Sequence, residues 1–364
     1  MAAEHRANNF NLIRLVLASS VILAHSPEII DGNCHREPAA LIFGAWTSLG
    51  DLAVDGFFIL SGYLIAQSWI SGPRLFPYLW KRALRIYPGF LAASLLSGLV
   101  LAPLGTEPHY WQFFSRRWFA KGLITLATPR VPPAFPGFPY PYINGPIWTI
   151  QYEFACYLTL GILGLLGLLG RRWVVLGGAL IVTSWAAAQL LGLVAPIPPD
   201  SIVQREDEQI PRLLSCFLAG SVFFLFRDHL RFNRWMILGS GVTLVLAMLN
   251  SVSGTILLPW LGGYLLLAAG NATVVPGTNW VRRDDISYGV YLYAWPIQML
   301  LLARLGVRNP WLLFAITLPI AMLAGWISWR LIEKPPLRWK NWRWKRSGST
   351  SSQNHEQQLG RDTQ

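Results

Sequence analysis

The stretch NNFNLIRLVLASSVILAHS, residues 8 to 26, decides how the rest of this chain is interpreted. Its apolar run is interrupted by Arg14 and His25, which lie eleven residues apart. At about 100° and 1.5 Å per residue, an α-helix places both on nearly one face, about 16 Å apart along its axis. In lipid both must face protein or water, because a charge against acyl chains costs at least about 2.5–3.5 kcal/mol. The alternative is a snorkelling arginine and an interfacial histidine.

The composition indicates a membrane protein. Of the 364 residues, 53% are hydrophobic and 13% are charged, and the mean hydropathy is +0.39. Soluble domains carry about 25% charged residues, so these charges are too few to cover a soluble protein of this size. We therefore expect an all-α fold, a polytopic transmembrane helical bundle. The multi-pass interpretation also explains the formal charge of +12, because basic residues gather in cytoplasmic connections.

Ten segments are each near the roughly 20 residues that a bilayer core requires. They lie near residues 10–30, 45–70, 86–104, 147–169, 173–194, 211–226, 235–250, 256–274, 286–304 and 311–331. Every short connection assigned to the inner side is basic, whereas the outer segment around Glu206, Asp207 and Glu208 is acidic. This pattern predicts that both termini are cytoplasmic. It also disfavours nucleic acid as a partner.

The domain organisation is expected to be simple. One membrane domain is expected over residues 1–346, followed by a polar, disordered cytoplasmic tail over 347–364. The three cysteines, Cys34, Cys156 and Cys216, show no CxxC spacing, so neither a disulfide framework nor a metal site is expected.

The longest interruption between apolar segments spans residues 105–146. WQFFSRRWFAKGLITL predicts an amphipathic helix at the outer interface. PRVPPAFPGFPYPYINGP is too rich in proline and glycine to form a regular helix. Its rings suit either an aromatic belt at the headgroup level or stacking on sugar faces.

Polar residues within the apolar segments are the candidate catalytic groups. Asp51 and Asp55 are four residues apart and share a helix face. Helical rise puts Asp55 on the order of 10 Å below the outer boundary, and it brings His25 and Glu153 to a similar depth. Such groups are costly in lipid unless they pair or face water. We therefore take His25, Glu153 and Asp55 as catalytic candidates, with a structural polar network between helices as the alternative.

A basic cluster lies at the inner side. YLWKRALRIYP carries Lys81, Arg82 and Arg85 just before an apolar segment, and Arg14 lies at the same side. Arginine binds phosphate through two parallel hydrogen bonds, so the cluster suits a phosphate-bearing donor that enters from the cytoplasm. The alternative is ordinary anchoring by positive charges. A histidine supported by a carboxylate above such a site suits removal of a proton from an alcohol, and hence acyl transfer to a hydroxyl.

Several motifs, taken together, resemble a known family. They are Arg14 and His25 in the arginine-x10-histidine pattern, VDGFFILSGYL at 54–64, KRALRIYP at 81–88, PIWTIQYE at 146–153, ISYGVYLYAWP at 286–296 and LIEKP at 331–335. In order and spacing they resemble the integral-membrane acyltransferases of the acyltransferase-3 group, which modify exported glycans and some small molecules. Where the family often has histidine, this chain has Ala294.

The resemblance implies roles for residues of these motifs. His25 would be essential, and Asp55 and Glu153 would be the carboxylates of the second and fourth motifs. Arg14, Arg82 and Arg85 would help to bind coenzyme A, with Lys81 beside them in the basic run. From the aromatic residues of the motifs we expect Trp148 and Tyr291 to contact donor or substrate.

The subgroup that fits best is the xanthan-type exopolysaccharide acetyltransferases of the bacterial inner membrane. The co-substrate would be acetyl-CoA, with no resident cofactor, and the acceptor a sugar hydroxyl on a glycan or lipid-linked oligosaccharide. Other polysaccharide-assembly proteins are further candidate partners. Two other functions stay open: a proton-coupled transporter or flippase, and a membrane glycosyltransferase, for which Glu206, Asp207 and Glu208 would be the only acidic loop.

Overall fold

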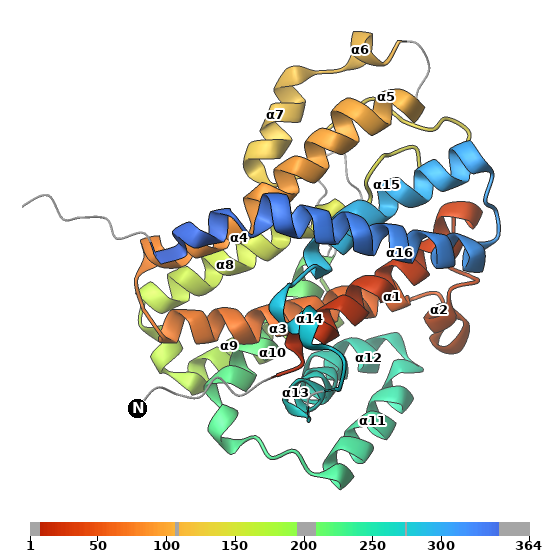
Figure 1. Ribbon diagram of the computed structural model, residues 1–364. Helices are drawn as coiled ribbons and strands as arrows, with labels where there is room; N and C mark the ends of the chain where they lie inside the picture. The colour runs from red at the N-terminus through yellow and green to blue at the C-terminus, as the bar shows by residue number, and fades with distance from the viewer. Residues whose placement is uncertain (1–7, 106–108, 195–208, 274, 342–364) are drawn as a thin grey trace, which may run out of the picture.

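The computed structural model describes residues 8–105, 109–194, 209–273 and 275–341 (Figure 1). Within these ranges the regular structure is helical and no strand occurs, which confirms the predicted all-α class. The predicted tail over 347–364 and the acidic segment Glu206, Asp207 and Glu208 lie outside the described residues.

Each of the ten predicted segments is helical over most of its described residues, and the helix of the third begins at Leu75, eleven residues earlier than predicted. Nine of them correspond to α1 Phe10–Asp31, α3 Leu49–Ile70, α4 Leu75–Leu96, α8 Thr149–Leu165, α9 Arg172–Leu190, α10 Ile210–Leu225, α11 Arg234–Met248, α15 Ser287–Leu305 and α16 Pro310–Ser328. The remaining one is built from α12 Ser251–Leu257, the π-helical turn Leu258–Gly262 and α13 Gly263–Asn271. Shorter helices are α2 Pro38–Phe43, α5 Ala102–Gly105, α6 Tyr110–Phe113, α7 Arg116–Thr125 and α14 Asn279–Arg283.

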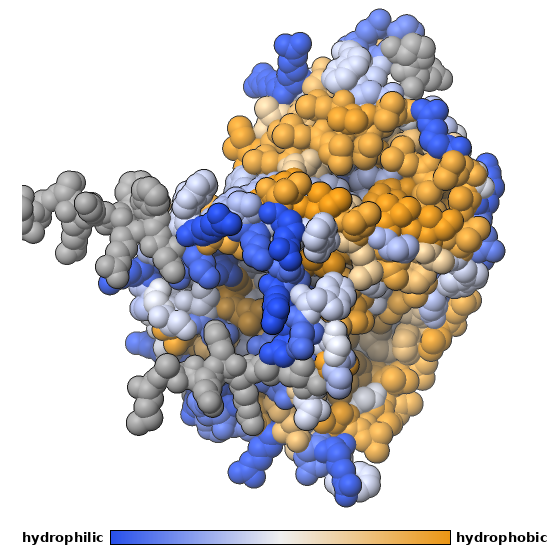
Figure 2. Space-filling view, viewed as in Figure 1, coloured by the Kyte–Doolittle hydropathy of each residue, from blue (hydrophilic) through white to orange (hydrophobic). Residues whose placement is uncertain are grey.

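Six described helical segments are long and apolar enough to cross a membrane. These are Phe10–Asp31, Leu49–Ile70, Leu75–Gly105, Arg172–Leu190, Ser251–Asn271 and Pro310–Glu333. Figure 2 shows a wide hydrophobic area over α16 and the helices beside it, with hydrophilic side chains concentrated at the left of the view and around the rim. The chain is thus a multi-pass membrane protein by length and composition. The count of ten crossings and the cytoplasmic position of both termini stay predictions.

The ends of α1 and α3 are fixed by local chemistry. At the start of α3 the Ser48 hydroxyl accepts from the Asp51 backbone N–H at 3.0 Å, and the Asp51 carboxylate accepts from the Ser48 N–H at 3.1 Å. This capping box satisfies backbone donors that a helix start leaves free. α1 ends at Gly32, whose φ of +72° is left-handed and whose position leaves no room for a Cβ beside Pro139. Local interactions therefore fix where α1 ends and where α3 begins.

α3 is the central helix of the bundle and packs against α1, α8 and α10. Its contact with α10 is a backbone contact: a Cβ on Gly62 would lie 1.9 Å from the Phe217 carbonyl oxygen, and one on Gly220 would lie 2.0 Å from that of Ile59. Small residues allow such close approach between membrane helices. α1 in turn lies against α15 and α16 on its other side.

The segment predicted as an amphipathic outer helix forms the short helix α6 and then α7, which lie beside α5 at the top of the view in Figure 1. The following proline-rich residues, 129–145, contain neither helix nor strand, as predicted. Part of this loop packs with the C-terminal part of α1 and with α15, where Phe135, Ile29 and Trp295 share a buried apolar cluster. The loop thus covers the end of the bundle at which α1 ends, and its position on the outer side of a membrane stays a prediction.

The close contact between α3 and α10 predicts that Gly220→Ala destabilises the protein. The new methyl group would meet backbone that cannot rotate away, and overpacking of this kind costs about 1–3 kcal/mol. Thermal unfolding in detergent measures the effect. Gly178→Ala on α9 is the matched control, because a Cβ there meets nothing within 4 Å. Equal melting temperatures for the two variants would contradict the close contact.

Candidate active site

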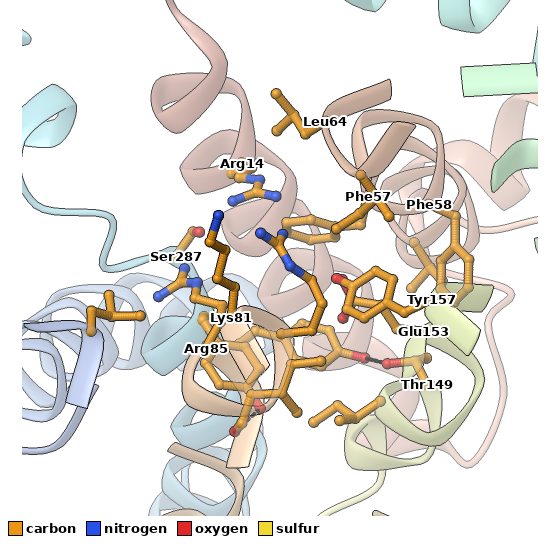
Figure 3. Close-up of a pocket in the computed structure, with 18 of the residues that line it drawn as sticks. Arg14, Phe57, Phe58, Leu64, Lys81, Arg85, Thr149, Glu153, Tyr157 and Ser287 are labelled. Atoms are coloured by element: carbon orange, nitrogen blue, oxygen red, sulfur yellow. Dashed lines mark hydrogen bonds between the residues drawn. The ribbon is translucent and has the colours of Figure 1, made fainter. Parts of the chain in front are cut away.

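A cavity of about 330 Å³ opens between α1, α3, α4, α8 and α15. Its polar lining residues include Arg14, Lys81, Arg82, Arg85, Glu153 and Tyr157. In Figure 3 the nitrogens of Arg14, Lys81 and Arg85 gather on one side of the cavity, and the oxygens of Glu153, Tyr157 and Thr149 lie on the other. The volume is at the lower end of the range for small-molecule sites. The four cations that the sequence predicted to bind a donor therefore share one cavity.

Two of these cations are held by acidic residues. Asp285 Oδ2 accepts from Arg14 Nη1 at 3.0 Å and from Arg85 Nη2 at 2.6 Å. Arg85 Nη1 also donates to the buried Glu333 at 3.2 Å. Burial opposes ionisation of Asp285, but Arg85 and Arg14 outweigh it and hold the pKa of that carboxyl below its usual range. Arg14 and Arg85 therefore have their charge largely compensated.

The other two cations have no acidic partner within the described chain. Lys81 makes no ion pair there, and Arg82 donates only to the Ser68 hydroxyl, at 3.4 Å. The Arg82 Nε is buried and unpartnered. A buried donor without a partner costs about 1–3 kcal/mol, and an anion in the cavity would satisfy it. Lys81 and Arg82 are thus the side chains best placed to bind phosphate.

The opposite wall of the cavity carries Glu153 and Tyr291. The Glu153 carboxylate accepts from the Ser61 hydroxyl at 3.1 Å and from the Tyr157 hydroxyl. Tyr291 donates to the Pro146 carbonyl at 2.6 Å and lies 2.8 Å from the Thr149 hydroxyl. Both predicted residues therefore line the cavity. Trp148 does not: it packs edge-on against Tyr152 at 5.5 Å.

His25 lies outside this cavity, in the C-terminal part of α1. Its Nδ1 is 2.6 Å from the Glu28 carboxylate, one turn further along the helix, and Nε2 has no hydrogen-bond partner in the described chain. The ring meets Trp295 edge-on at 4.9 Å, and Trp295 in turn stacks on Tyr142 of the outer loop at 5.7 Å. A neutral imidazole whose Nδ1–H is held by a carboxylate leaves Nε2 as a base.

The cavity and His25 are connected through two helices. α1 carries Arg14 in the cavity and His25 above it, and α15 carries Tyr291 in the cavity wall and Trp295 against His25. Tyr291 and Trp295 are one helical turn apart, about 6 Å. The layer around Tyr291, Thr149 and Trp295 therefore separates the cavity from the imidazole.

Asp55 has different neighbours from those expected of a group acting with His25. Its Oδ2 accepts from Arg212 Nη1 at 2.9 Å, and it faces a second cavity. His25, Glu153 and Asp55 thus have separate partners: Glu28, the Ser61 and Tyr157 hydroxyls, and Arg212. The catalytic roles of the three residues stay predictions, and Glu28 is the carboxylate that contacts the imidazole.

Sequence reasoning missed Glu28, Asp285, Glu333 and Arg212 as partners. Glu28 stands three residues after His25, a helical spacing that brings side chains together. Asp285 stands directly before ISYGVYLYAWP, and Glu333 lies inside LIEKP. Arg212 is the lone cation within an apolar segment, a type of residue that usually has a partner. Among the described residues no group of three or more His, Cys, Asp or Glu side chains could hold a metal ion.

These features define an all-helical membrane protein with a basic cavity at one end of α1 and a histidine–carboxylate pair at the other. Residues 8–330 match the family described as the acyltransferase domain, and the chain belongs to this family. This confirms the resemblance noted in the sequence.

Three relatives extend over most of the chain. An O-acetyl transferase of Shigella phage Sf6 is 28% identical over 91% of this chain and 96% of its own length. Nodulation protein 10 of Rhizobium leguminosarum bv. viciae is 28% identical over 93% of this chain and 95% of its own. The acyltransferase MdmB of Streptomyces mycarofaciens is 24% identical over 80% of this chain and 82% of its own length. No solved structure matches the chain.

The ion pairs of Asp285 predict that Asp285→Asn lowers stability. Removing one partner of a buried pair leaves uncompensated charge on Arg14 and Arg85, and such losses are about 3–5 kcal/mol. The stability that this carboxylate contributes is present above the ordinary carboxyl pKa and is lost as the pH falls through its lowered value. The gap between wild type and Asp285→Asn should therefore be constant near neutral pH and narrow below about pH 4.

Melting temperatures in detergent across this pH range test the prediction. Asp228→Asn is the control, because Asp228 is exposed and its nearest cation, Arg227, is 3.8 Å away. A melting temperature for Asp285→Asn equal to that of wild type at neutral pH would mean that the pairs do not stabilise the fold.

Proposed function

We propose that this protein is a membrane O-acyltransferase. It moves an acetyl group from cytoplasmic acetyl-CoA to a sugar hydroxyl of an exported or lipid-linked polysaccharide, at the bacterial inner membrane. The observation that carries the proposal is the arrangement along α1: at one end a cavity whose lining cations Lys81, Arg82 and Lys340 have no acidic partner in the described chain, and at the other a carboxylate-held histidine. Membership of the acyltransferase family and the O-acetyl transferase among its relatives support the reaction class.

The donor side of the proposal rests on Lys81 and Arg82. Their charges would bind the phosphates of acetyl-CoA, while Asp285 holds Arg14 and Arg85 in fixed positions at the same wall. The thioester end would then point along the cavity toward Tyr291 and Thr149. An acceptor would approach from the outer side, where Trp295 contacts His25 and Tyr142 stacks on Trp295.

In the transfer step His25 Nε2 would take the proton of the acceptor hydroxyl as its oxygen attacks the thioester carbonyl. Glu28 would hold the Nδ1–H and stabilise the imidazolium that forms. A new carbon–oxygen bond forms and the carbon–sulfur bond breaks. The leaving thiolate takes the proton from the imidazolium, which restores neutral His25. For the reacting groups to meet, the layer of Tyr291, Thr149 and Trp295 must move apart.

His25→Ala should abolish acetyl transfer, and Glu28→Gln should lower kcat about 10²-fold or more, because a positioned acid–base group contributes about 10²–10⁴. Transfer of labelled acetyl from acetyl-CoA to the de-O-acetylated surface glycan, by protein in lipid nanodiscs, measures both. Asp31→Asn is the control on the same helix, since Asp31 pairs with the exposed Arg36.

Wild-type transfer by His25→Ala would remove that residue from the mechanism. If the wild-type protein moved a solute or lipid across vesicle membranes without forming an acyl product, the proton-coupled transporter or flippase would replace the acyltransferase.

Arg82→Ala should raise the KM for acetyl-CoA about 10-fold to 100-fold, because a hydrogen bond to a charged group contributes about 1.5–3 kcal/mol. kcat should change much less, since Arg82 lies far from the transferred group in this scheme. Arg74→Ala is the control: this exposed arginine precedes α4 and does not line the cavity. An unchanged donor KM for Arg82→Ala would leave Arg82 as a topological anchor.

A further inference from the structure

A second cavity, of about 320 Å³, lies between the start of α3, the end of α9, the start of α10 and α12. Its lining includes Trp46, Asp51, Asp55, Gln189 and Arg212. It shares no lining residue with the donor cavity. The two are nevertheless close, because Asp55 lines the second cavity and its neighbour Val54 lines the first. α3 is therefore the wall between them.

The centre of the second cavity is an ion pair held in place by helix packing. Arg212 donates to Asp55 at 2.9 Å and to Asp51 at 3.3 Å. Gly62 and Gly220 bring α3 and α10 into backbone contact, and Asp55 and Arg212 stand seven and eight residues before these glycines. At about 1.5 Å per residue both side chains reach the same height. The Asp55 side chain is 2% exposed and that of Asp51 is 40% exposed, so the cavity extends from the interior to an accessible rim.

Three polar atoms of this cavity's lining residues are buried and have no nitrogen or oxygen hydrogen-bond partner in the described chain, and beside Asp55 lies only the weakly donating Cys216 thiol. The three atoms are Asp55 Oδ1, Arg212 Nε and Gln189 Nε2. Each such group costs about 1–3 kcal/mol when left unsatisfied, and native proteins hold few of them. Three among the lining residues of one cavity give it hydrogen-bonding capacity that a polar ligand would use.

The chemistry of these atoms selects the class of ligand. One is an acceptor and two are donors, so the matching group must both donate and accept, as hydroxyls do. A metal ion is disfavoured by the Arg212 guanidinium, and a phosphate by the carboxylates of Asp51 and Asp55. An apolar ligand would leave all three atoms unsatisfied. Trp46 adds an aromatic face at the rim, with 36% of the residue exposed.

We propose that the second cavity binds one sugar ring of the acceptor glycan, a ring other than the one that is acylated. The identity of that glycan as acceptor rests on the proposed function. Asp55 Oδ1, Arg212 Nε and Gln189 Nε2 bind ring hydroxyls, and Trp46 covers the ring face. The volume suits a single ring more than a chain. Asp55 thereby acts in acceptor binding, and it is not the base of the transfer.

The test uses full-length protein in nanodiscs with two probes. These are a short and a long de-O-acetylated oligosaccharide prepared from the surface glycan of the cells that carry the gene. Gln189→Leu removes two donors with little change in size. It should raise the KM for the long oligosaccharide about threefold to tenfold, the effect of one or two hydrogen bonds. The short one should show a smaller rise, and kcat and the KM for acetyl-CoA should change less than about twofold.

Three further variants separate binding from folding. Gln189→Leu should not lower the melting temperature, because the amide nitrogen it removes has no partner in the described chain. Trp46→Ala should also raise the acceptor KM, and Trp46→Phe should restore it, since both wild type and Trp46→Phe present a ring. Gln67→Leu is the control, because this exposed glutamine on α3 lines neither cavity.

The results of these experiments distinguish a failure of the proposed sugar site from a failure of the proposed acyl transfer. If wild type transfers acetyl and Gln189→Leu has the same acceptor KM for both oligosaccharides, the subsite is wrong and the reaction stands. If wild type binds the long oligosaccharide without transferring acetyl, and Gln189→Leu binds it more weakly, the sugar site stands and the acyl transfer is wrong. If wild type neither binds nor acylates either oligosaccharide, both proposals fall.

Discussion

The double ion pair of Asp285 with Arg14 and Arg85 is the interaction on which the arrangement of this protein depends. It joins the N-terminal part of α1 and the middle of α4 to the segment just before α15, and Glu333 adds the π-helical turn Trp329–Glu333 that follows α16 through the second nitrogen of Arg85. Arg85 also lies over the rings of Tyr288 and Trp329. Buried charges are tolerated only when they are paired in good geometry. The pairing fixes where these helices meet, and it leaves Lys81, Arg82 and Lys340 as the lining cations without an acidic partner in the described chain.

The same bundle separates three chemical tasks in space. The basic cavity lies on one side of α3, the Asp55–Arg212 cavity lies on a neighbouring face, and His25 lies beyond the cavity wall near the outer loop. Gly62 and Gly220 allow α3 and α10 to touch. In the proposed reaction this division keeps the nucleotide end of the donor apart from the sugar acceptor, and only the acyl group has to pass the layer of Tyr291 and Trp295.

The helices and the basic cluster could be predicted from the sequence because both depend on local spacing. Apolar length predicted the helices, and the spacing of Lys81, Arg82 and Arg85 predicted three cations just before an apolar segment. In the structure they lie within α4, which begins at Leu75, and they line one cavity with Arg14. The predicted depth of a residue in the membrane could not show which side chain it contacts. His25, Asp55 and Glu153 lie at similar predicted heights, but the angle around each helix decides the contacts. Asp55 is turned toward Arg212 on α10, and His25 meets Glu28 of its own helix.

The central claim is that donor and acceptor act from opposite sides of one bundle. Uniformly oriented protein in sealed vesicles tests it directly, with acetyl-CoA supplied only on the side of Lys81 and Arg82 and the de-O-acetylated oligosaccharide only on the side of His25. The account predicts that labelled acetyl appears on the oligosaccharide across the sealed membrane. Acetylation only when both substrates share one side would contradict it.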